Sequence, residues 1–291
     1  MKISVSSYSY SRYLTQGHTI LDVVDKAHEM GFSAMEFIDI PGDDFLARKD
    51  KAKEVKERLD SYGMEVTAYT IGADMYKTGD DFKNQFDILK NQLDIASILG
   101  APLMRHDATY QKPVIGNGLM SFDKMLPVMA ENTRVVTEYA KTLGIKTCVE
   151  NHGYVVQDAE RLERYFNAVN HENFGILVDM GNFLCADSDP ILSVSRLAPY
   201  AIHVHAKDMI FYSGEGHNPG GGCFSTRGGN WLRGTVIGQG SVPVKQCLRA
   251  LRFAGYRGNL GIEFEGCEDP IESIDRGHTN LKKYLEQLDN E

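Results

Sequence analysis

Apolar residues recur along the chain at two alternating spacings. In three segments, apolar side chains lie three and four positions apart, and each segment ends on a glycine. The segments are residues 19–31, 82–100 and 122–144. This spacing predicts amphipathic helices, and glycine suits the left-handed conformation that often ends a helix. A short apolar run follows each glycine within a few residues. The pattern therefore predicts a repeated unit of strand and helix.

Eight short runs have the composition of buried strands. They are residues 3–9, 34–40, 65–71, 102–108, 146–152, 174–180, 201–208 and 260–266. A helical pattern follows each run, and eight strands alternating with helices predict a (β/α)8 TIM barrel. A doubly wound parallel sheet is the alternative. Because no linker rich in proline and serine interrupts the sequence, we expect residues 1–291 to form a single domain.

One long stretch, residues 209–240, shows neither spacing and is rich in glycine. It lies between the seventh predicted strand and its helix, so we expect a long loop there. Loops of this length inside a compact domain are usually functional or disordered. At the catalytic end of a barrel, such a loop is expected to form a lid or a wall of the pocket.

Composition and charge narrow the class of protein. The chain has 42% hydrophobic and 24% charged residues, as ordinary globular proteins do. It contains neither an apolar run of about 20 residues nor a signal-peptide pattern, so we expect a cytoplasmic protein that does not bind membranes. A net charge of -9 argues against nucleic acid as a partner. Five scattered cysteines without a C-x-x-C pair argue against a disulfide framework or a thiolate zinc site.

Four consecutive predicted strands carry, near their ends, a residue that can bind a metal ion. Side chains alternate between the two faces of a strand, and the strand neighbours of these four residues are all apolar. The four residues are therefore predicted to face the barrel interior together, at the carboxyl ends of the strands, where TIM barrels carry their active sites. They are Glu150, Asp179, His205 and Glu263, and their apolar neighbours are Val149, Val178, Val204, Ile262 and Phe264.

Three carboxylates and one imidazole make a ligand set that is rich in oxygen. We expect one divalent ion, Mn²⁺, with Co²⁺, Mg²⁺ and Zn²⁺ as alternatives, because a structural zinc site would use more cysteine or histidine. Such an ion would hold two neighbouring oxygens of a hydroxy-carbonyl compound and stabilise an enediolate. Carboxylates on opposite sides of the substrate would remove and return the proton. This chemistry indicates isomerisation or epimerisation of a sugar.

Five stretches of the sequence carry a family resemblance: "VENHG", "VDMGNF", "HVHAKD", "IGQGSVPV" and "GYRGNLGIEFEG". They resemble the sugar phosphate isomerase/epimerase family, whose members have a xylose isomerase-like barrel and are related to the endonuclease IV group. The resemblance implies that Glu150, Asp179, His205 and Glu263 hold one ion and that the two glutamates are also the acid/base pair. The chain departs at Asn182, where epimerases of free ketoses often carry a histidine and where the endonucleases use one in their trinuclear zinc site. This departure and the acidic charge argue against DNA repair.

Other polar residues near the strand ends are candidates for catalysis and substrate binding. His152 lies two residues after Glu150, so we expect it to be a further acid/base residue; the alternative is a loop histidine bonded to backbone. Lys207 continues the inward phase of the seventh strand, and His106 ends the fourth strand. Both are predicted to contact substrate.

The remaining candidates depend on strand phase and on the long loop. His203 lies one layer deeper than the histidine ligand, so we expect it to support the site. Glu265 lies two residues beyond the glutamate ligand of the eighth strand, and an error in phase would exchange the two. In the loop, Arg227, Trp231 and Arg233 would suit a sugar that carries a phosphate or carboxylate. The alternative is a solvated loop with an oligomer contact.

Two classes of function remain open. The first is a divalent-metal-dependent isomerase or epimerase acting on a sugar, a sugar phosphate or a keto-sugar. The second is a lyase-type barrel subunit that acts on oxidised (3-keto) glycosides, such as in C-glycoside deglycosidation, together with a small partner subunit. Some members of the superfamily open carbon–glycosidic bonds in this way. In both cases we expect a small carbohydrate as the substrate, with a homo-oligomer or a small partner subunit as alternative assemblies.

Overall fold

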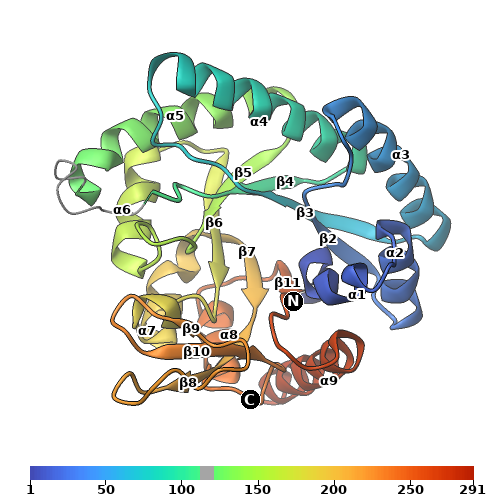
Figure 1. The fold of residues 1–291 in the computed structure, drawn as a ribbon, viewed down its shortest axis with the longest axis vertical. Helices are drawn as coiled ribbons and strands as arrows, with labels where there is room; N and C mark the ends of the chain where they lie inside the picture. Colours follow the sequence, from blue (N-terminus) through green and yellow to red (C-terminus); the bar gives the residue numbers. More distant parts are fainter. Residues whose placement is uncertain (112–120) are drawn as a thin grey trace.

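The computed structural model describes residues 1–111 and 121–291. Eight parallel strands form a closed barrel in the order β1-β11-β7-β6-β5-β4-β3-β2 (Figure 1). The predicted single-domain (β/α)8 barrel is therefore confirmed. The barrel strands are β1 (Lys2–Ser6), β2 (Ala34–Ile38), β3 (Glu65–Ile71), β4 (Leu103–His106), β5 (Lys146–Glu150), β6 (Phe174–Asp179), β7 (Ala201–Ala206) and β11 (Asn259–Ile262).

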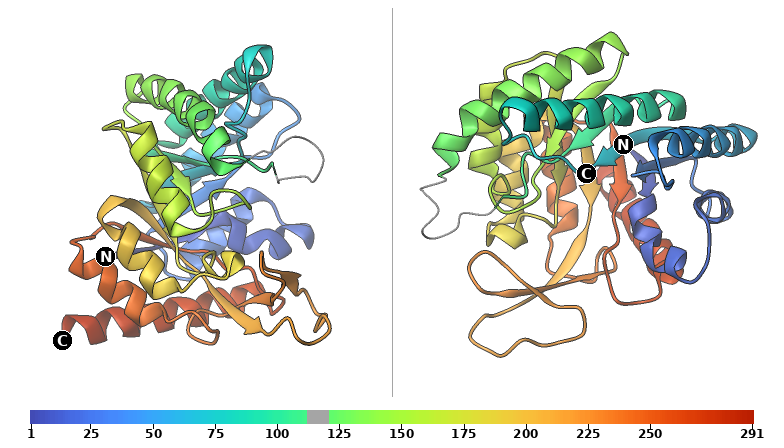
Figure 2. Two further views of the ribbon diagram at one scale, coloured as in Figure 1. Left: turned by 90° about the vertical axis from the view of Figure 1, so that its left-hand side faces the viewer. Right: turned by 45° about the horizontal axis from the view of Figure 1, so that its top comes forward.

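Helices surround the strands on the outside of the barrel (Figures 1 and 2). They are α1 (Ser11–Thr15), α2 (Ile20–Glu29), α3 (Phe45–Tyr62), α4 (Gly79–Leu99), α5 (Phe122–Thr142), α6 (Ala159–Val169), α7 (Pro190–Leu197), α8 (Val244–Phe253) and α9 (Pro270–Asp289), with short 3-10 turns η1 (Ser7–Tyr10), η2 (Leu184–Ala186) and η3 (Ala198–Tyr200). Gly31, Gly100 and Gly144, expected at helix ends, adopt φ angles of 79°, 73° and 71°. Within the two described ranges, no helix has the length and apolar character needed to cross a membrane.

The main hydrophobic core lies between the strands and the helices. The five apolar neighbours of the predicted ligands all belong to this core, which confirms the phase assigned to these strands. A smaller apolar cluster forms inside the barrel, from Ala68, Leu103, Cys148 and Leu177 on β3 to β6. Buried polar side chains occupy much of the remaining interior, and they form the site described below.

The stretch predicted as a long loop contains a second sheet, so the prediction for residues 209–240 is corrected. Strands β8 (Asp208–Tyr212), β10 (Trp231–Thr235) and β9 (Phe224–Ser225) pair antiparallel in the order β8-β10-β9. Met209 on β8 and Leu232 on β10 are buried, and the two strands pair from Asp208 opposite Thr235 to Tyr212 opposite Trp231. The sheet projects from the body of the barrel, as the right-hand view in Figure 2 shows.

Asp208 connects this second sheet to the turn that follows it. One carboxylate oxygen accepts hydrogen bonds from the backbone N–H groups of Met209 and Val242, and the other accepts from Gly238 and Gly240. Three backbone N–H groups of the motif "IGQGSVPV" therefore donate to one buried carboxylate. Because Asp208 lies at the start of β8, these bonds also fix where the second sheet leaves the barrel.

Candidate metal centre

Four side chains from four strands converge inside the barrel. One ligand atom from each of Glu150, Asp179, His205 and Glu263 lies within 4.8 Å of all the others. Nδ1 of His205 is 3.4 Å from Glu150 Oε1, 3.7 Å from Asp179 Oδ2 and 3.6 Å from Glu263 Oε2. All four residues are buried. The structure thus brings together the four ligands that the sequence predicted.

Two atoms in this cluster lack a hydrogen-bond partner although they are buried. They are Nδ1 of His205 and Oδ2 of Asp179. A buried polar atom without a partner costs free energy, so such atoms in a native fold require an explanation. A divalent cation between them would provide a partner for both, and the set of three carboxylates and one imidazole suits such an ion. The residues present therefore fit a metal centre.

Backbone and amide groups hold Asp179 and Glu150 in place. Oδ1 of Asp179 accepts from the N–H groups of Gly181 and Asn182 at 2.7 and 2.8 Å, which leaves Oδ2 facing the cluster. The Asn182 side chain donates to Glu150 Oε1 at 3.0 Å. Asn182 therefore helps to orient the carboxylate of Glu150, which was predicted to bind metal.

Arg105 provides the main positive charge beside Glu150. Its Nη2 lies 2.5 Å from Glu150 Oε2 and 2.9 Å from Asp107 Oδ1. Burial alone would raise the pKa of Glu150, but Arg105 and His205 outweigh burial and hold that pKa well below its usual range. Glu150 is therefore an anion at neutral pH, as a metal ligand must be.

His152 faces the cavity and pairs with Asp107. Its Nδ1 lies 2.7 Å from Asp107 Oδ1, and 48% of its side chain is exposed. Burial lowers the pKa of His152, but the hydrogen bond to Asp107 and the negative charges of Asp107 and Glu150 together outweigh burial, so the net pKa is raised. A histidine oriented by a carboxylate can exchange protons with a bound molecule. The predicted acid/base role for His152 stays a prediction, and this geometry is compatible with it.

Lys207 bridges the two glutamates that follow β11. Its ammonium group contacts Glu263 directly and lies 3.2 Å from Glu265 and 3.5 Å from Asp179. Burial would raise the pKa of Glu263, but Lys207 and His205 lower it below its usual range. Glu263 belongs to the metal set and Glu265 does not, so the phase assigned from the sequence was correct.

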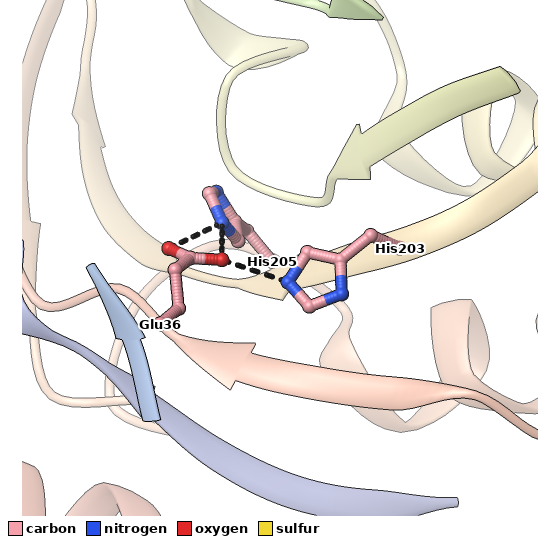
Figure 3. A group of neighbouring side chains, drawn as sticks. All are labelled: Glu36, His203 and His205. Carbon is pink, nitrogen blue, oxygen red and sulfur yellow. Dashed lines mark hydrogen bonds and ion pairs between the residues drawn. The ribbon is translucent and has the colours of Figure 1, made fainter. Parts of the chain in front are cut away.

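His203 lies deeper in the barrel and is connected to the site through Glu36. Both His203 Nε2 and His205 Nε2 lie within hydrogen-bond distance of the Glu36 carboxylate, at 2.7 and 2.9 Å from the same oxygen (Figure 3). The three side chains are fully or almost fully buried. This arrangement agrees with the supporting role expected for His203.

A cavity of about 570 Å³ opens above the ligand cluster. Its walls come from barrel strands and from the 224–227 segment of the second sheet, so the stretch predicted as a pocket wall does line the cavity. Arg227 connects this segment to the β5–α6 connection. It binds Asp158 at 2.9 Å and the backbone oxygen of Tyr154. Glu150, His152, Lys207 and Glu263 also line the cavity.

Three predicted substrate contacts lie elsewhere, which corrects the expectation for them. His106 faces away from the interior, because Arg105 occupies the inward position of β4; burial lowers the pKa of His106 to about 4. Its ring lies 6.2 Å from that of Phe174. Trp231 and Arg233, on β10, are not among the described residues that line the cavity, and Arg233 lies 3.9 Å from Glu268.

Sequence reasoning missed three functional neighbours of the ligands, namely Glu36, Arg105 and Asp107. Each is a charged residue in or beside a strand whose other residues have the composition of a buried strand. The two stretches are "AMEFIDI" and "PLMRHDA". A charge at an inward position of a buried strand is rare unless it is paired, and this was the available signal.

The family model for the xylose isomerase-like TIM barrel matches residues 24–284. The chain therefore belongs to the xylose isomerase-like TIM barrel family.

Individual relatives agree with this assignment. The rhizopine catabolism protein MocC of Rhizobium meliloti is 30% identical over 159 residues, which are 52% of this chain and 48% of that protein. The chain spans about half the length of the curated relatives it matches. A D-tagatose 3-epimerase-like protein superposes with a TM-score of 0.74 and 21% identity, over 100% of this chain and 99% of that chain. The IOLI protein, solved with a binding zinc atom, superposes with a TM-score of 0.74 and 15% identity, over 99% of each chain.

Proposed function

We propose that this protein is a divalent-metal-dependent isomerase or epimerase of a sugar, working by proton transfer through an enediolate. The observation that carries the proposal is the convergence of His205 Nδ1 with three carboxylates at the base of a polar cavity. The chain shares its fold with a D-tagatose 3-epimerase-like protein, which supports this proposal.

Glu150, Asp179, His205 and Glu263 would hold the ion. When bound there, a divalent cation supplies a Lewis acid for neighbouring hydroxyl and carbonyl oxygens of the sugar. We propose Mn²⁺, with Co²⁺, Mg²⁺ and Zn²⁺ as alternatives, because oxygen ligands outnumber the single nitrogen.

Proton transfer falls to the two glutamates. β5, which carries Glu150, and β11, which precedes Glu263, are separated in the barrel by β6 and β7, so the two carboxylates approach the cavity from different sides. One carboxylate removes the proton from the carbon next to the carbonyl, and the other returns a proton to it. Arg105 and Lys207 lower the pKa of these two groups, so both start ionised. The carboxylate that returns the proton therefore first takes one from solvent, and the carboxylate that removed the proton releases it to solvent.

The charges around the cavity favour an uncharged sugar over a sugar phosphate. Charged hydrogen bonds from Lys or Arg are the strong contacts to a phosphate group, and they require side chains that are free to make them. In the described part of the chain, every cationic Lys or Arg side chain on the cavity wall is already paired with a carboxylate. Arg105 pairs with Glu150 and Asp107, Lys207 with Glu263 and Glu265, and Arg227 with Asp158.

The test is turnover of a panel of free ketoses, sugar phosphates and 3-keto glycosides by Mn²⁺-loaded protein in D₂O. Isomerase or epimerase chemistry should place deuterium on the carbon next to the carbonyl. Glu150→Gln and Glu263→Gln should each reduce turnover by roughly 10² to 10⁴-fold, since each removes one proton-transfer group. Removal of metal by EDTA should abolish turnover, and Mn²⁺ should restore it. Full activity of verified metal-free protein, or wild-type rates in both glutamine variants, would overturn the proposal.

A second candidate is a lyase that acts on oxidised (3-keto) glycosides with a partner subunit. The observation that favours it is the Asp107–His152 pair on the cavity wall, which provides a base outside the ligand set. In such an elimination, the base takes the proton next to the carbonyl, a carbon–carbon double bond forms and the bond to the leaving group breaks. The same panel distinguishes the two functions, because a lyase gives an unsaturated sugar and a released group.

A further inference from the structure

Glu36 is a fully buried carboxylate that is not part of the cavity wall. It lies on β2, and its partners His203 and His205 lie on β7, at the other side of β1 and β11 in the barrel order. Its side chain must therefore cross the barrel interior in front of two strands. Interiors of TIM barrels are usually filled by bulky branched side chains, which would block this path.

Small residues on the two intervening strands leave the path open. Gly261 on β11 is in register with His205 on one side and with Ser4 of β1 on the other. A Cβ atom on Gly261 would lie 3.3 Å from Cδ2 of His205 and 3.5 Å from Oε2 of Glu36. A Cβ atom at this position would therefore already touch both groups, and a side chain that extends further would meet the contact between Glu36 and His205.

Both histidines direct the same ring nitrogen toward Glu36 (Figure 3). His203 Nε2 lies 2.7 Å from Oε2, and His205 Nε2 lies 2.9 Å from that oxygen and 3.0 Å from Oε1. The two rings are nearly perpendicular, at 81°. His203 forms a hydrogen bond with Oε2 of Glu36 from a deeper layer of the barrel. This bond restrains the carboxylate in the orientation that contacts His205.

This contact determines which nitrogen of His205 carries a proton. An ionised carboxylate only accepts hydrogen bonds, so His205 must carry its proton on Nε2 to satisfy Glu36. When a cation is bound, the ring is neutral and its lone pair is on Nδ1, the atom that lies 3.4 to 3.7 Å from the three carboxylates of the metal set. A metal ligand requires that lone pair, and the partner of the other nitrogen orients the ring.

We infer that Glu36 is a positioning residue that holds His205 as the Nε2-protonated tautomer, with Nδ1 directed at the cation, and that His203 in turn holds Glu36. This inference rests on the proposed metal-dependent function of the same site. It identifies a part of the centre that touches neither the ion nor the substrate.

The first test compares Co²⁺ affinity of the wild-type protein and of Glu36→Gln by titration against a competing chelator. Glutamine has one acceptor oxygen and one NH₂ group in place of the two carboxylate oxygens that face His205. The side chain at position 36 therefore no longer requires His205 to carry its proton on Nε2. We expect Co²⁺ to bind 10 to 100-fold more weakly, as is typical when the hydrogen-bond partner of a ligating histidine is lost. His203→Gln keeps Glu36 but removes its restraint, and it should weaken binding by a smaller factor.

The second readout separates positioning from a general loss of stability. In ¹⁵N NMR of histidine-labelled, Zn²⁺-loaded protein, His205 should carry its proton on Nε2 in the wild type, and this signal should shift or broaden in Glu36→Gln. Thr67→Val is the matched control, because Thr67 is buried in the same barrel and bonds to Ser4 and to the backbone of Met35, not to His205. It should lower the melting temperature and leave Co²⁺ affinity unchanged.

The outcomes distinguish this inference from the proposed function. Co²⁺ affinity and ¹⁵N spectra that are unchanged in folded Glu36→Gln would overturn the inference alone. Two ions per wild-type chain, with one lost in His203→Gln, would also overturn it, because Glu36 and His203 would then be ligands themselves. A wild-type protein that binds no divalent ion would overturn both the inference and the proposed metal-dependent function.

Discussion

Nη2 of Arg105 lies 2.5 Å from Oε2 of Glu150, and both side chains are buried. The same nitrogen also binds Asp107 at 2.9 Å. A buried carboxylate is costly unless a cation and hydrogen bonds compensate for the water it loses. One guanidinium group therefore stabilises both a predicted metal ligand and the carboxylate that orients His152.

Replacing Arg105 with leucine should destabilise the metal-free protein by about 3–5 kcal/mol, because two buried carboxylates lose their cation. Urea unfolding followed by circular dichroism measures this change. Added Mn²⁺ should stabilise the variant, since the ion supplies positive charge beside Glu150. A loss below about 1 kcal/mol would show that Glu150 and Asp107 are not paired in this way.

Replacing Asp179 with asparagine should change stability in opposite directions with and without metal. Burial raises the pKa of Asp179, and the neighbouring carboxylates of Glu263 and Glu150 add to this effect, so its ionised form disfavours the folded state at neutral pH when no ion is bound. Metal-free Asp179→Asn should thus melt at a higher temperature than the wild type.

Bound metal should reverse this order of melting temperatures, so that the wild type melts above Asp179→Asn. For the wild type, an ion at a hundred times its Kd adds about 2.7 kcal/mol to the free energy of unfolding. The variant lacks one anionic ligand and should gain little. Thermal melts in EDTA and in Mn²⁺ measure both effects, and equal stabilisation of the two proteins by Mn²⁺ would contradict the assignment of Asp179 as a ligand.

Arg227, rather than Arg233, should affect substrate binding. Arg227 lines the cavity and connects the second sheet to Asp158, whereas Arg233 contacts only Glu268, at 3.9 Å, among the ion pairs of the described residues. Arg227→Ala should raise KM about tenfold, which corresponds to about 1.4 kcal/mol. Arg233→Ala is the matched control and should leave KM within about twofold. The reverse pattern would mean that β10 contributes to the substrate site.

His278 should make stability depend on pH. Burial lowers its pKa to about 4, against an ordinary value of about 6.5, and its ring stacks on Phe32 with centroids 4.2 Å apart. Because the folded-state pKa is the lower one, the contribution of His278 is fully present above about pH 6.5. It is lost as the pH falls toward 4, since the unfolded chain binds the proton first.

The comparison of wild type with His278→Gln isolates this contribution. Urea unfolding at several pH values should show that the wild type loses about 1–3 kcal/mol more than the variant between pH 6.5 and pH 4. Parallel pH profiles of the two proteins would show that His278 is protonated in the folded state, contrary to this prediction.

The composition of single strands was enough to predict that four metal-competent side chains face the barrel interior together. Glu150, Asp179, His205 and Glu263 alternate with apolar neighbours that belong to the outer core. Because alternation along a strand is a local property, it determines which side chains share a face without any knowledge of strand pairing. The barrel itself followed from counting strand and helix units, which are also local patterns.

The same local reasoning failed where the pattern was short or the partner was remote. β4 has only four residues and carries Arg105 and His106 side by side, so its sequence alone does not show which one faces inward. The strands within residues 209–240 are short and are separated by glycine-rich stretches, and their pairing brings together residues far apart in sequence, such as Met209 and Gly234.

Tertiary structure alone decided which charges meet inside the barrel. Glu36 and His205 are separated by 169 residues in sequence and become neighbours only when the barrel closes. Arg105 reaches Glu150 because β4 and β5 pair. A sequence indicates that a buried charge needs a partner, but the choice of partner depends on strand order, register and the small residues that leave a path, and these are properties of the closed barrel.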